Sequence, residues 1–283
     1  MKLCISTYSL WGWCAQRRAS MDKALTFIAS LGVDGVEFVA RDQDQGDNPL
    51  AWAARMRKRC DALKLKIAGY CVGAELLSNP ADQKSVVAKL KRDVDVACAL
   101  GTDRLRHDVT HGPHKGESFT QVLRAVVPAI REVADHAAGC GVVTSLENHG
   151  FYLQTAERVE KLIRAVDRKN FGLTLDLGNF LCLNQDPTAA TRQLARHAVM
   201  VHAKDFHVRN KKAIPSTGWF ATPTPIALRG AILGHGTLDL PAQFRILKKA
   251  GYAGWVSIEF EGMEPPEQGL SLGVDYARSL MKS

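Results

Sequence analysis

Four residues of types that bind divalent metals each stand at or near the end of a run of apolar and β-branched residues. Glu147 ends the run 142–147, and the three others are Asp176, His202 and Glu259. A charged carboxylate is costly to bury unless a cation or a hydrogen-bond donor pairs with it. Because all four residues close strand-like runs, we predict that they bind one metal ion together.

Side chains along a strand alternate between its two faces, and this alternation places the four residues on the same side. Glu147 shares a face with Ser145, and Glu259 shares one with Ser257, whereas the opposite face carries apolar residues such as Leu146. The same alternation brings further polar groups to the inward face near the same end, namely Ser6, Tyr8, Glu37, Tyr70, Arg106 and Asp108. We therefore expect one mouth that combines metal ligands with substrate contacts.

Strand-like runs alternate with amphipathic helical runs along the whole chain, which is the pattern of parallel βα units. The predicted strands are 3–7, 35–39, 65–70, 104–108, 142–147, 172–176, 199–204 and 255–259. The predicted helices are 20–31, 50–63, 82–100, 118–139, 155–167, 187–196, 239–250 and 266–282. Eight βα units predict an α/β fold, a single (β/α)8 TIM-barrel domain over residues 1–283 with its site at the C-terminal ends of the strands.

One segment departs from this alternation. Residues 206–236 are rich in Pro, Gly and Thr and lie between the seventh predicted strand and the helix that follows it. A long loop after a strand lies on the C-terminal face of a barrel, so we predict that this one lies over the site and could close over a ligand. A disordered insertion is the alternative, but Trp219 and Phe220 carry apolar surface that favours a packed loop.

The composition is that of an ordinary globular protein, with 46% hydrophobic residues and no run near the roughly 20 apolar residues of a membrane span. The N-terminal residues 1–6 enter a strand pattern without the features of a signal peptide, so we expect a cytoplasmic location. The formal charge of +8 is spread over many helices, which favours solvated faces over a nucleic-acid partner. Seven scattered cysteines without a CxxC pair argue against a disulfide framework and a structural zinc site.

Two glutamates, an aspartate and a histidine form an oxygen-rich ligand set. Such a set suits one divalent ion of the type Mn²⁺, Mg²⁺ or Co²⁺ better than a thiolate-binding metal, and Zn²⁺ stays open. The ion would stabilise an enediolate while a neighbouring C–H proton is removed. Glu147 and Glu259 approach from different sides of the barrel and can act as base and acid on opposite faces of a substrate. This arrangement predicts epimerisation or aldose–ketose isomerisation.

The sequence around these residues also resembles a known superfamily. The motifs are Ser-Leu-Glu147-Asn-His, Leu-Thr-Leu-Asp176-Leu-Gly-Asn, Val-His202-Ala-Lys-Asp, Gly234-His-Gly-Thr-Leu-Asp239 and Gly-Tyr252-Ala-Gly-Trp-Val-Ser-Ile-Glu259. With them the whole chain resembles the sugar phosphate isomerase/epimerase type of the xylose-isomerase-like TIM barrels. The resemblance implies the four metal ligands named above, with Glu147 and Glu259 as the catalytic acid and base. It implies a small carbohydrate or keto-acid substrate, and the sequence is compatible with a homo-oligomer.

Several residues near these motifs are candidates for substrate contact. They are Tyr8, Trp11, Glu37, Tyr70, Arg106, His149, Asn179, Lys204 and Arg209. Asn179 stands where many ketose epimerases of this type have a histidine, and Arg209 is the candidate for an arginine that follows their histidine ligand. Lys204 could instead form an ion pair with Glu37 or Asp108. His107 falls on the helix-facing side and is predicted to be structural, whereas His111 and His114 lie in the loop beyond.

Three other functions are alternatives, and the residues argue against the last two. Glu147 with His149, and His202 with Lys204, also resemble metal-dependent dehydratases of 3-dehydroshikimate or inosose, which share the proton-abstraction step. An apurinic endonuclease of the same superfamily would need a trinuclear zinc cluster, for which the chain has too few ligands. A non-catalytic sugar-binding barrel would require a broken ligand set, and this set is whole.

Overall fold

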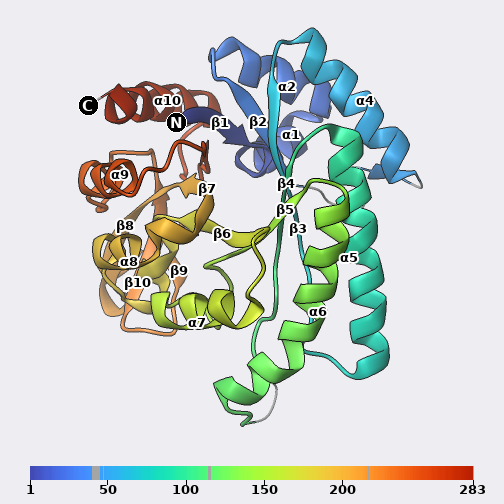
Figure 1. The fold of residues 1–283 in the computed structure, drawn as a ribbon. Helices are drawn as coiled ribbons and strands as arrows, with labels where there is room; N and C mark the ends of the chain where they lie inside the picture. Colours follow the sequence, from blue (N-terminus) through green and yellow to red (C-terminus); the bar gives the residue numbers. More distant parts are fainter. Residues whose placement is uncertain (40–44, 47, 114–115, 216, 283) are drawn as a thin grey trace.

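Eight parallel strands close into a barrel at the centre of the molecule (Figure 1). The computed structural model describes residues 1–39, 45–46, 48–113, 116–215 and 217–282. Around the barrel the strand order is β1, β2, β3, β4, β5, β6, β7 and β11. Their bounds are Lys2–Ser6, Gly35–Val39, Lys66–Val72, Arg104–His107, Val143–Glu147, Phe171–Asp176, Ala198–Ala203 and Trp255–Ile258. The predicted TIM barrel is confirmed, and each predicted strand overlaps an observed one.

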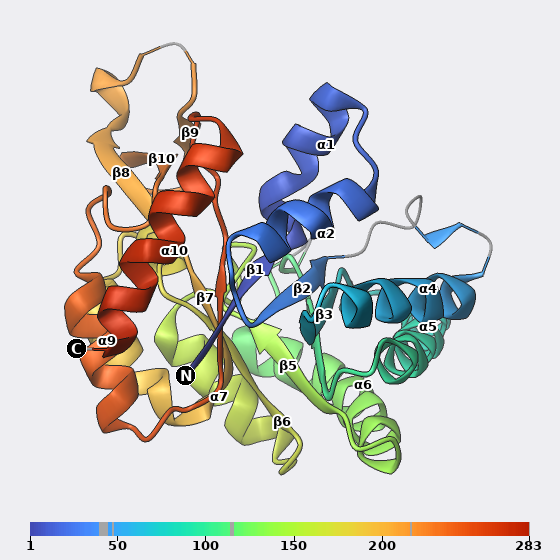
Figure 2. The same cartoon turned by 90° about the horizontal axis from the view of Figure 1, so that it is seen from above.

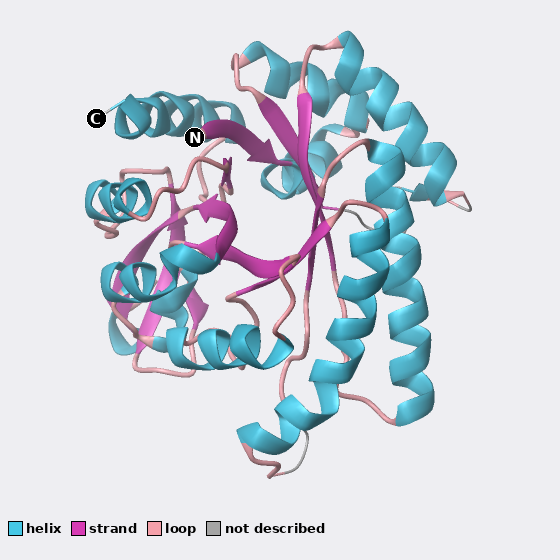
Figure 3. Ribbon diagram, in the orientation of Figure 1, coloured by secondary structure: helices cyan, strands magenta, loops and turns pink. Residues whose placement is uncertain are grey.

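Helices surround the barrel and cover the outer faces of its strands (Figure 3). Those that follow the strands are α2 Met21–Ser30, α4 Pro49–Ala62, α5 Pro80–Leu100, α6 Phe119–Gly139, α7 Ala156–Val166, α8 Pro187–Leu194, α9 Leu240–Lys249 and α10 Pro266–Lys282. Side-chain caps mark their starts: Asn79 accepts from the amides of Ala81 and Asp82, and Asp239 caps α9 as predicted. None of the described helices combines the length and apolar character that crossing a membrane requires.

Strand β3 differs from the prediction in a way that matters for the site. The register between β2 and β3 shifts by one residue, so that Val36 pairs with Ile67 but Glu37 pairs with Gly69, and β3 continues to Val72. Such a bulge reverses which residues face inward. Cys71 therefore faces the interior, whereas Tyr70 packs outward near Trp52, with ring centroids 6.3 Å apart. The prediction that Tyr70 points into the mouth is wrong.

Residues beyond β1 and β7 form regular structure where loops were predicted. Trp11–Arg17 is helix α1. Within the segment 206–236, strands β8 Asp205–Asn210, β9 Phe220–Ala221 and β10 Ile226–Ala231 form a separate antiparallel sheet in the order β8, β10, β9 (Figure 2). The sheet is anchored because Phe206 and Leu228 are buried together with Cys182. The described part of this segment is therefore not a disordered insertion.

Candidate metal centre and active site

The four predicted ligands lie together at the C-terminal end of the barrel. One ligand atom from each of Glu147, Asp176, His202 and Glu259 lies within 4.8 Å of those of the others, and all four residues are buried. Glu147 and Asp176 end β5 and β6, His202 lies in β7, and Glu259 follows β11. The closed barrel brings them together because parallel strands end at the same face.

Two atoms of this cluster favour a bound cation. His202 Nδ1 has no hydrogen-bond partner in the described part of the chain, although Glu259 Oε1 and Glu147 Oε1 lie 3.4 and 3.5 Å away. Asp176 Oδ2 likewise accepts no hydrogen bond there, although Lys204 Nζ is 3.1 Å distant. Buried polar atoms are normally satisfied, so unpaired atoms within a ligand-type cluster fit a site that binds a cation. Three carboxylates and one imidazole suit a hard or borderline divalent ion.

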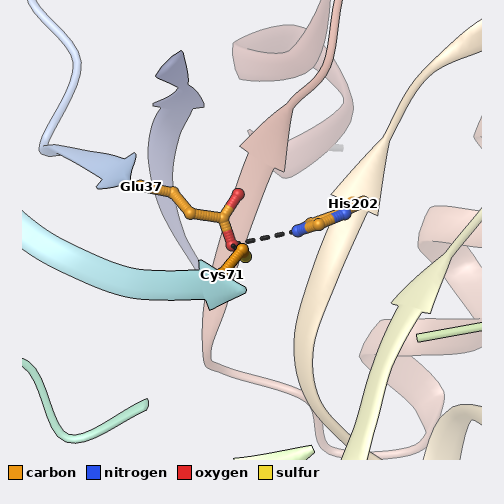
Figure 4. Close-up of side chains that lie close together, drawn as sticks. All are labelled: Glu37, Cys71 and His202. Atoms are coloured by element: carbon orange, nitrogen blue, oxygen red, sulfur yellow. Dashed lines mark hydrogen bonds and ion pairs between the residues drawn. The ribbon is translucent and has the colours of Figure 1, made fainter. Parts of the chain in front are cut away.

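Glu37 contacts His202 (Figure 4) and does not line the cavity at the barrel mouth. Its Oε1 is 3.0 Å from His202 Nε2 and accepts a 3.3 Å hydrogen bond from Cys71 Sγ, while Oε2 accepts a 2.8 Å bond from Ser257 Oγ. Burial lowers the pKa of His202, but the carboxylates, first Glu37 and then Glu259 and Glu147, raise it well above its ordinary value. The partner of Glu37 is thus a histidine and not a lysine or arginine.

Arg106 holds Glu147 in its ionised form. One guanidinium nitrogen of Arg106 lies 2.7 Å from Glu147 Oε2 and 3.0 Å from Asp108 Oδ1, and Asn179 Nδ2 donates to Glu147 Oε1 over 3.1 Å. Burial by itself would raise the pKa of Glu147. Arg106, and after it His202, lower this pKa by more than burial raises it, so it falls well below the usual range. Asn179 therefore contacts a candidate metal ligand directly and also begins a short 3-10 helix, 179–183.

Lys204 plays the corresponding part beside Glu259. Its Nζ lies 2.7 Å from Glu259 Oε2 and 3.1 Å from both Asp176 Oδ2 and Glu261 Oε1. The suggested ion pairs of Lys204 with Glu37 or Asp108 are therefore wrong. Burial, opposed by Lys204 and reinforced by Glu147 and Glu259, raises the pKa of Asp176 to about 6.

Glu261 was missed by the sequence analysis. It stands two residues beyond Glu259, and the same two-residue spacing had indicated His149 after Glu147 and Lys204 after His202. Applied to β11, the alternation of side chains would have found it. Glu261 lines the cavity at the barrel mouth, and its negative charge, followed by burial, raises the pKa of Tyr8 to about 12.

A cavity of about 280 Å³ opens above the cluster and is lined by several predicted contact residues. Tyr8 and Trp11 form one side, with ring centroids 5.0 Å apart in an edge-to-face arrangement. Arg106, His149 and Lys204 line the cavity as well. A cavity of this size, with aromatic walls and charged residues at its base, fits a small polar ligand.

A second cavity of about 260 Å³ adjoins the first and links it to the segment 206–236. Phe206, Phe220 and Asn179 line it, together with four residues that also line the main cavity, namely Tyr8, His149, Lys204 and Glu261. The described part of the segment therefore borders the cluster.

Arg209 and Trp13 lie away from the cavity above the metal-ligand cluster. The Arg209 guanidinium stacks over Trp219 at 5.4 Å from the ring centroid, on the exposed part of β8. Trp13 stacks on Phe27 and donates a 2.7 Å hydrogen bond to Glu267. These contacts explain both residues structurally, so the substrate contact predicted for Arg209 has no support in the described geometry.

The remaining histidines have different surroundings. His149 Nδ1 lies 3.5 Å from Asp108 Oδ1 at the cavity wall, and the hydrogen bond to Asp108 raises the pKa of His149 above its usual value. His107 is buried and faces the helices, as predicted. His111 is largely exposed and contacts Glu75 at 3.2 Å. His114 lies outside the described residues.

Residues 25–280 match the family described as xylose isomerase-like TIM barrel. The chain belongs to this family. An inosose dehydratase from Geobacillus thermodenitrificans is 24% identical over 216 residues, which cover 73% of this chain and 72% of that protein. The rhizopine catabolism protein MocC from Rhizobium meliloti is 28% identical over 163 residues, which cover 56% of this chain and about half, 48%, of that relative.

Solved structures share the fold at lower identity. An L-ribulose 3-epimerase superposes with a TM-score of 0.76 at 19% identity. The superposition covers 99% of this chain and 94% of the epimerase chain. The probable 3-DHS dehydratase AsbF from Bacillus anthracis gives a TM-score of 0.77 at 17% identity, and the superposition covers 98% of this chain and 99% of the AsbF chain. The IOLI protein with a bound zinc atom gives a TM-score of 0.79 at 18% identity, and the superposition covers 100% of this chain and 98% of the IOLI chain.

Proposed function

We propose that this protein is a divalent-metal-dependent enzyme that removes a proton next to the carbonyl of a small polyhydroxylated ketone. The observation that supports it is the buried cluster of Glu147, Asp176, His202 and Glu259 beneath a small polar cavity. Relatives named inosose dehydratase and L-ribulose 3-epimerase support a sugar or polyol substrate. A divalent ion held by these four side chains would polarise a substrate oxygen and acidify the neighbouring C–H group.

The two glutamates carry the proton transfer in this proposal. Glu147 and Glu259 both have lowered pKa values, because Arg106 and Lys204 outweigh the opposing effect of burial on each. Each is therefore ionised near neutral pH and able to accept a proton. The contacts to Arg106, Asn179 and Lys204 also fix the two carboxylates, and a fixed geometry lowers the barrier to proton transfer.

We infer an isomerase or epimerase as the first assignment. One glutamate removes a proton from one face of the substrate, and the other, once protonated, returns a proton to the opposite face. This requires two carboxylates on different strands around the cavity, which Glu147 on β5 and Glu259 after β11 supply. If the proton returns to the same carbon from the opposite face, the product is an epimer. If it returns to the neighbouring carbon, the product is an aldose–ketose isomer.

A dehydratase is the second assignment, and His149 favours it. His149 lines the cavity, and its contact with Asp108 raises its pKa, so the imidazole can hold a proton. In this reaction a glutamate removes the proton beside the carbonyl, and the hydroxyl on the next carbon leaves with the His149 proton as water. Relatives named inosose dehydratase and probable 3-DHS dehydratase agree with this chemistry.

Solvent-deuterium exchange over a panel of ketoses, keto-inositols and 3-dehydroshikimate tests the shared step. We expect metal-dependent exchange into one substrate class, with loss of exchange in Glu259→Gln. Product analysis then separates the assignments: an epimer or isomer supports the first, and a dehydrated product supports the second. Exchange at the full rate in Glu259→Gln, or none with any substrate after metal loading, would contradict the proposal.

A further inference from the structure

A second group of ligand-type side chains lies on the outside of the barrel, far from the cavity. One ligand atom from each of Asp95, His136 and Cys140 lies within 4.8 Å of those of the other two. Asp95 belongs to α5, and His136 lies in the last turn of α6, which Cys140 follows directly. These two helices run side by side (Figure 1).

The spacing of the residues explains why they converge. Asp95 and Cys98 are three residues apart on α5, and His136 and Cys140 are four apart at the end of α6. Residues three or four apart share one face of a helix, so each helix presents a pair to the other. The sequence pattern is thus Asp-x2-Cys facing His-x3-Cys, which a search for CxxC pairs does not detect.

The contacts within the group are close. His136 Nε2 lies 3.2 Å from Asp95 Oδ1. Cys98 Sγ is not among the three ligand atoms that lie within 4.8 Å of one another, but it borders them and donates a 3.8 Å hydrogen bond to the carbonyl oxygen of Cys140. Burial and then the nearby Cys140 thiol raise the pKa of Cys98. Both cysteines are free thiols. Asp95 and Cys140 are exposed, so an ion can reach the group from solvent.

This group is separate from the candidate active site. Helix α5 leads through Gly101 into the start of β4, and α6 leads into the start of β5. The group therefore lies at the N-terminal end of the barrel strands, whereas Glu147 and Asp176 end their strands at the opposite face. The two groups also differ chemically, because the cluster of Glu147, Asp176, His202 and Glu259 has no thiol, whereas the second group combines a carboxylate and an imidazole with the Cys140 thiol.

We propose that Asp95, Cys98, His136 and Cys140 form a second metal site that takes a thiophilic divalent cation, Zn²⁺ above all. Asp95, His136 and Cys140 already bring a carboxylate, an imidazole and a thiol together, and Cys98, whose thiol contacts the backbone of Cys140, would complete the four donors of a tetrahedral zinc site. Each thiol that becomes a ligand releases its proton to solvent. The bound ion would link the C-terminal ends of α5 and α6 and stabilise this side of the barrel.

Cobalt titration of the full metal-free chain, kept reduced, tests the proposal. Thiolate ligands give Co²⁺ a near-ultraviolet charge-transfer band, and the predicted ligands in the barrel include no thiolate. We expect the band in the wild-type chain and its loss in a variant carrying Cys98→Ser and Cys140→Ser. Cys71→Ser is the matched control, since this thiol lies beside Glu37 behind His202, and it should keep the band.

Zinc binding provides a measurement that does not depend on the band. In an Asp176→Asn background, which removes a barrel ligand, zinc should still raise the midpoint of thermal unfolding, because an ion bound to the native state stabilises it. His136→Gln in that background should abolish the rise. Absence of the cobalt band in the wild type, its persistence in the double cysteine variant, or an undiminished zinc effect in His136→Gln would each overturn the proposal.

Discussion

Glu37 Oε1 lies 3.0 Å from His202 Nε2, and both side chains are almost completely excluded from solvent, each about 1% exposed. The contact leaves Nδ1 as the histidine nitrogen that faces Glu147 and Glu259. A carboxylate on the far side of a metal-binding imidazole fixes the ring orientation and increases its basicity. Glu37 is therefore a positioning residue for the predicted metal ligand.

Glu37→Gln should weaken metal binding without unfolding the protein. The amide keeps the shape of the side chain but loses the charge that holds the imidazole, so we expect Mn²⁺ affinity to fall by about 10- to 100-fold. Isothermal titration calorimetry measures the change. Glu75→Gln is the control, because Glu75 contacts the largely exposed His111. Equal affinities in Glu37→Gln and the wild type would show that the contact does not support a metal ligand.

Lys204→Met should destabilise the metal-free protein by about 3–5 kcal/mol, because it leaves a buried group of carboxylates without its cation. The affected carboxylates are Asp176, Glu259 and Glu261. Urea unfolding in the presence of a chelator measures the free energy. Added Mn²⁺ should reduce the loss, since the ion supplies positive charge to two of the same carboxylates.

Lys161→Met is the matched control for this experiment. Lys161 forms an exposed ion pair with Glu157 one helical turn away, and such solvent-screened pairs contribute little to stability. A loss of similar size in Lys161→Met and Lys204→Met would contradict the role of Lys204 as the buried counter-ion.

Metal affinity should fall as the pH is lowered, and more steeply below about pH 6. The pKa of His202 is raised well above its ordinary value in the metal-free protein, so binding must displace its proton near neutral pH. The pKa of Asp176 is raised to about 6, so a second proton competes below that pH. Glu147 and Glu259 have lowered pKa values and stay ionised over this range.

The expected slope is about tenfold per pH unit above pH 6 and about a hundredfold per unit below it, one factor of ten for each proton displaced. Calorimetry in buffers of different ionisation enthalpy counts these protons directly. Glu37→Gln removes the largest influence that raises the pKa of His202, so its slope near neutral pH should be shallower. An affinity independent of pH would contradict the assignment of Asp176 and His202 as ligands.

Asp205→Asn should loosen the connection between β10 and α9. The Asp205 carboxylate accepts hydrogen bonds from the amides of Phe206 and Leu238 at Oδ1 and from Gly234 and Gly236 at Oδ2. In either orientation of an asparagine side chain, its NH2 group would face two of these backbone amides. Because an NH2 group cannot accept a hydrogen bond, those two bonds would be lost. We expect a loss of about 1–3 kcal/mol in thermal unfolding, with faster proteolysis of the segment 206–236.

Asp239→Asn is the control, since Asp239 caps α9 nearby and asparagine caps a helix as well as aspartate does. It should change stability little. Equal proteolysis rates in the wild type and Asp205→Asn would show that this carboxylate does not hold the segment in place.

The sequence alone was sufficient for the barrel and for the places of the four candidate ligands. Strand periodicity and βα alternation are local properties, and parallel strands must end at one face, so residues at those ends necessarily meet. The same reasoning would have reached Glu261 by continuing the alternation past Glu259. Tyr8, Trp11, Arg106, His149 and Lys204, which it proposed as substrate contacts, line the cavity, and their contact with substrate stays a prediction.

Only the tertiary structure decided the partners. A register shift between β2 and β3 exchanged Tyr70 for Cys71 at the interior, and no residue pattern announces such a bulge. Glu37 meets His202 because barrel closure brings β2 near β7, two strands that are not neighbours. The pairs on α5 and α6 face one another through helix packing, and the sheet of β8, β9 and β10 forms through antiparallel pairing. Contacts between distant segments depend on how the elements pack, which local sequence periodicity does not encode.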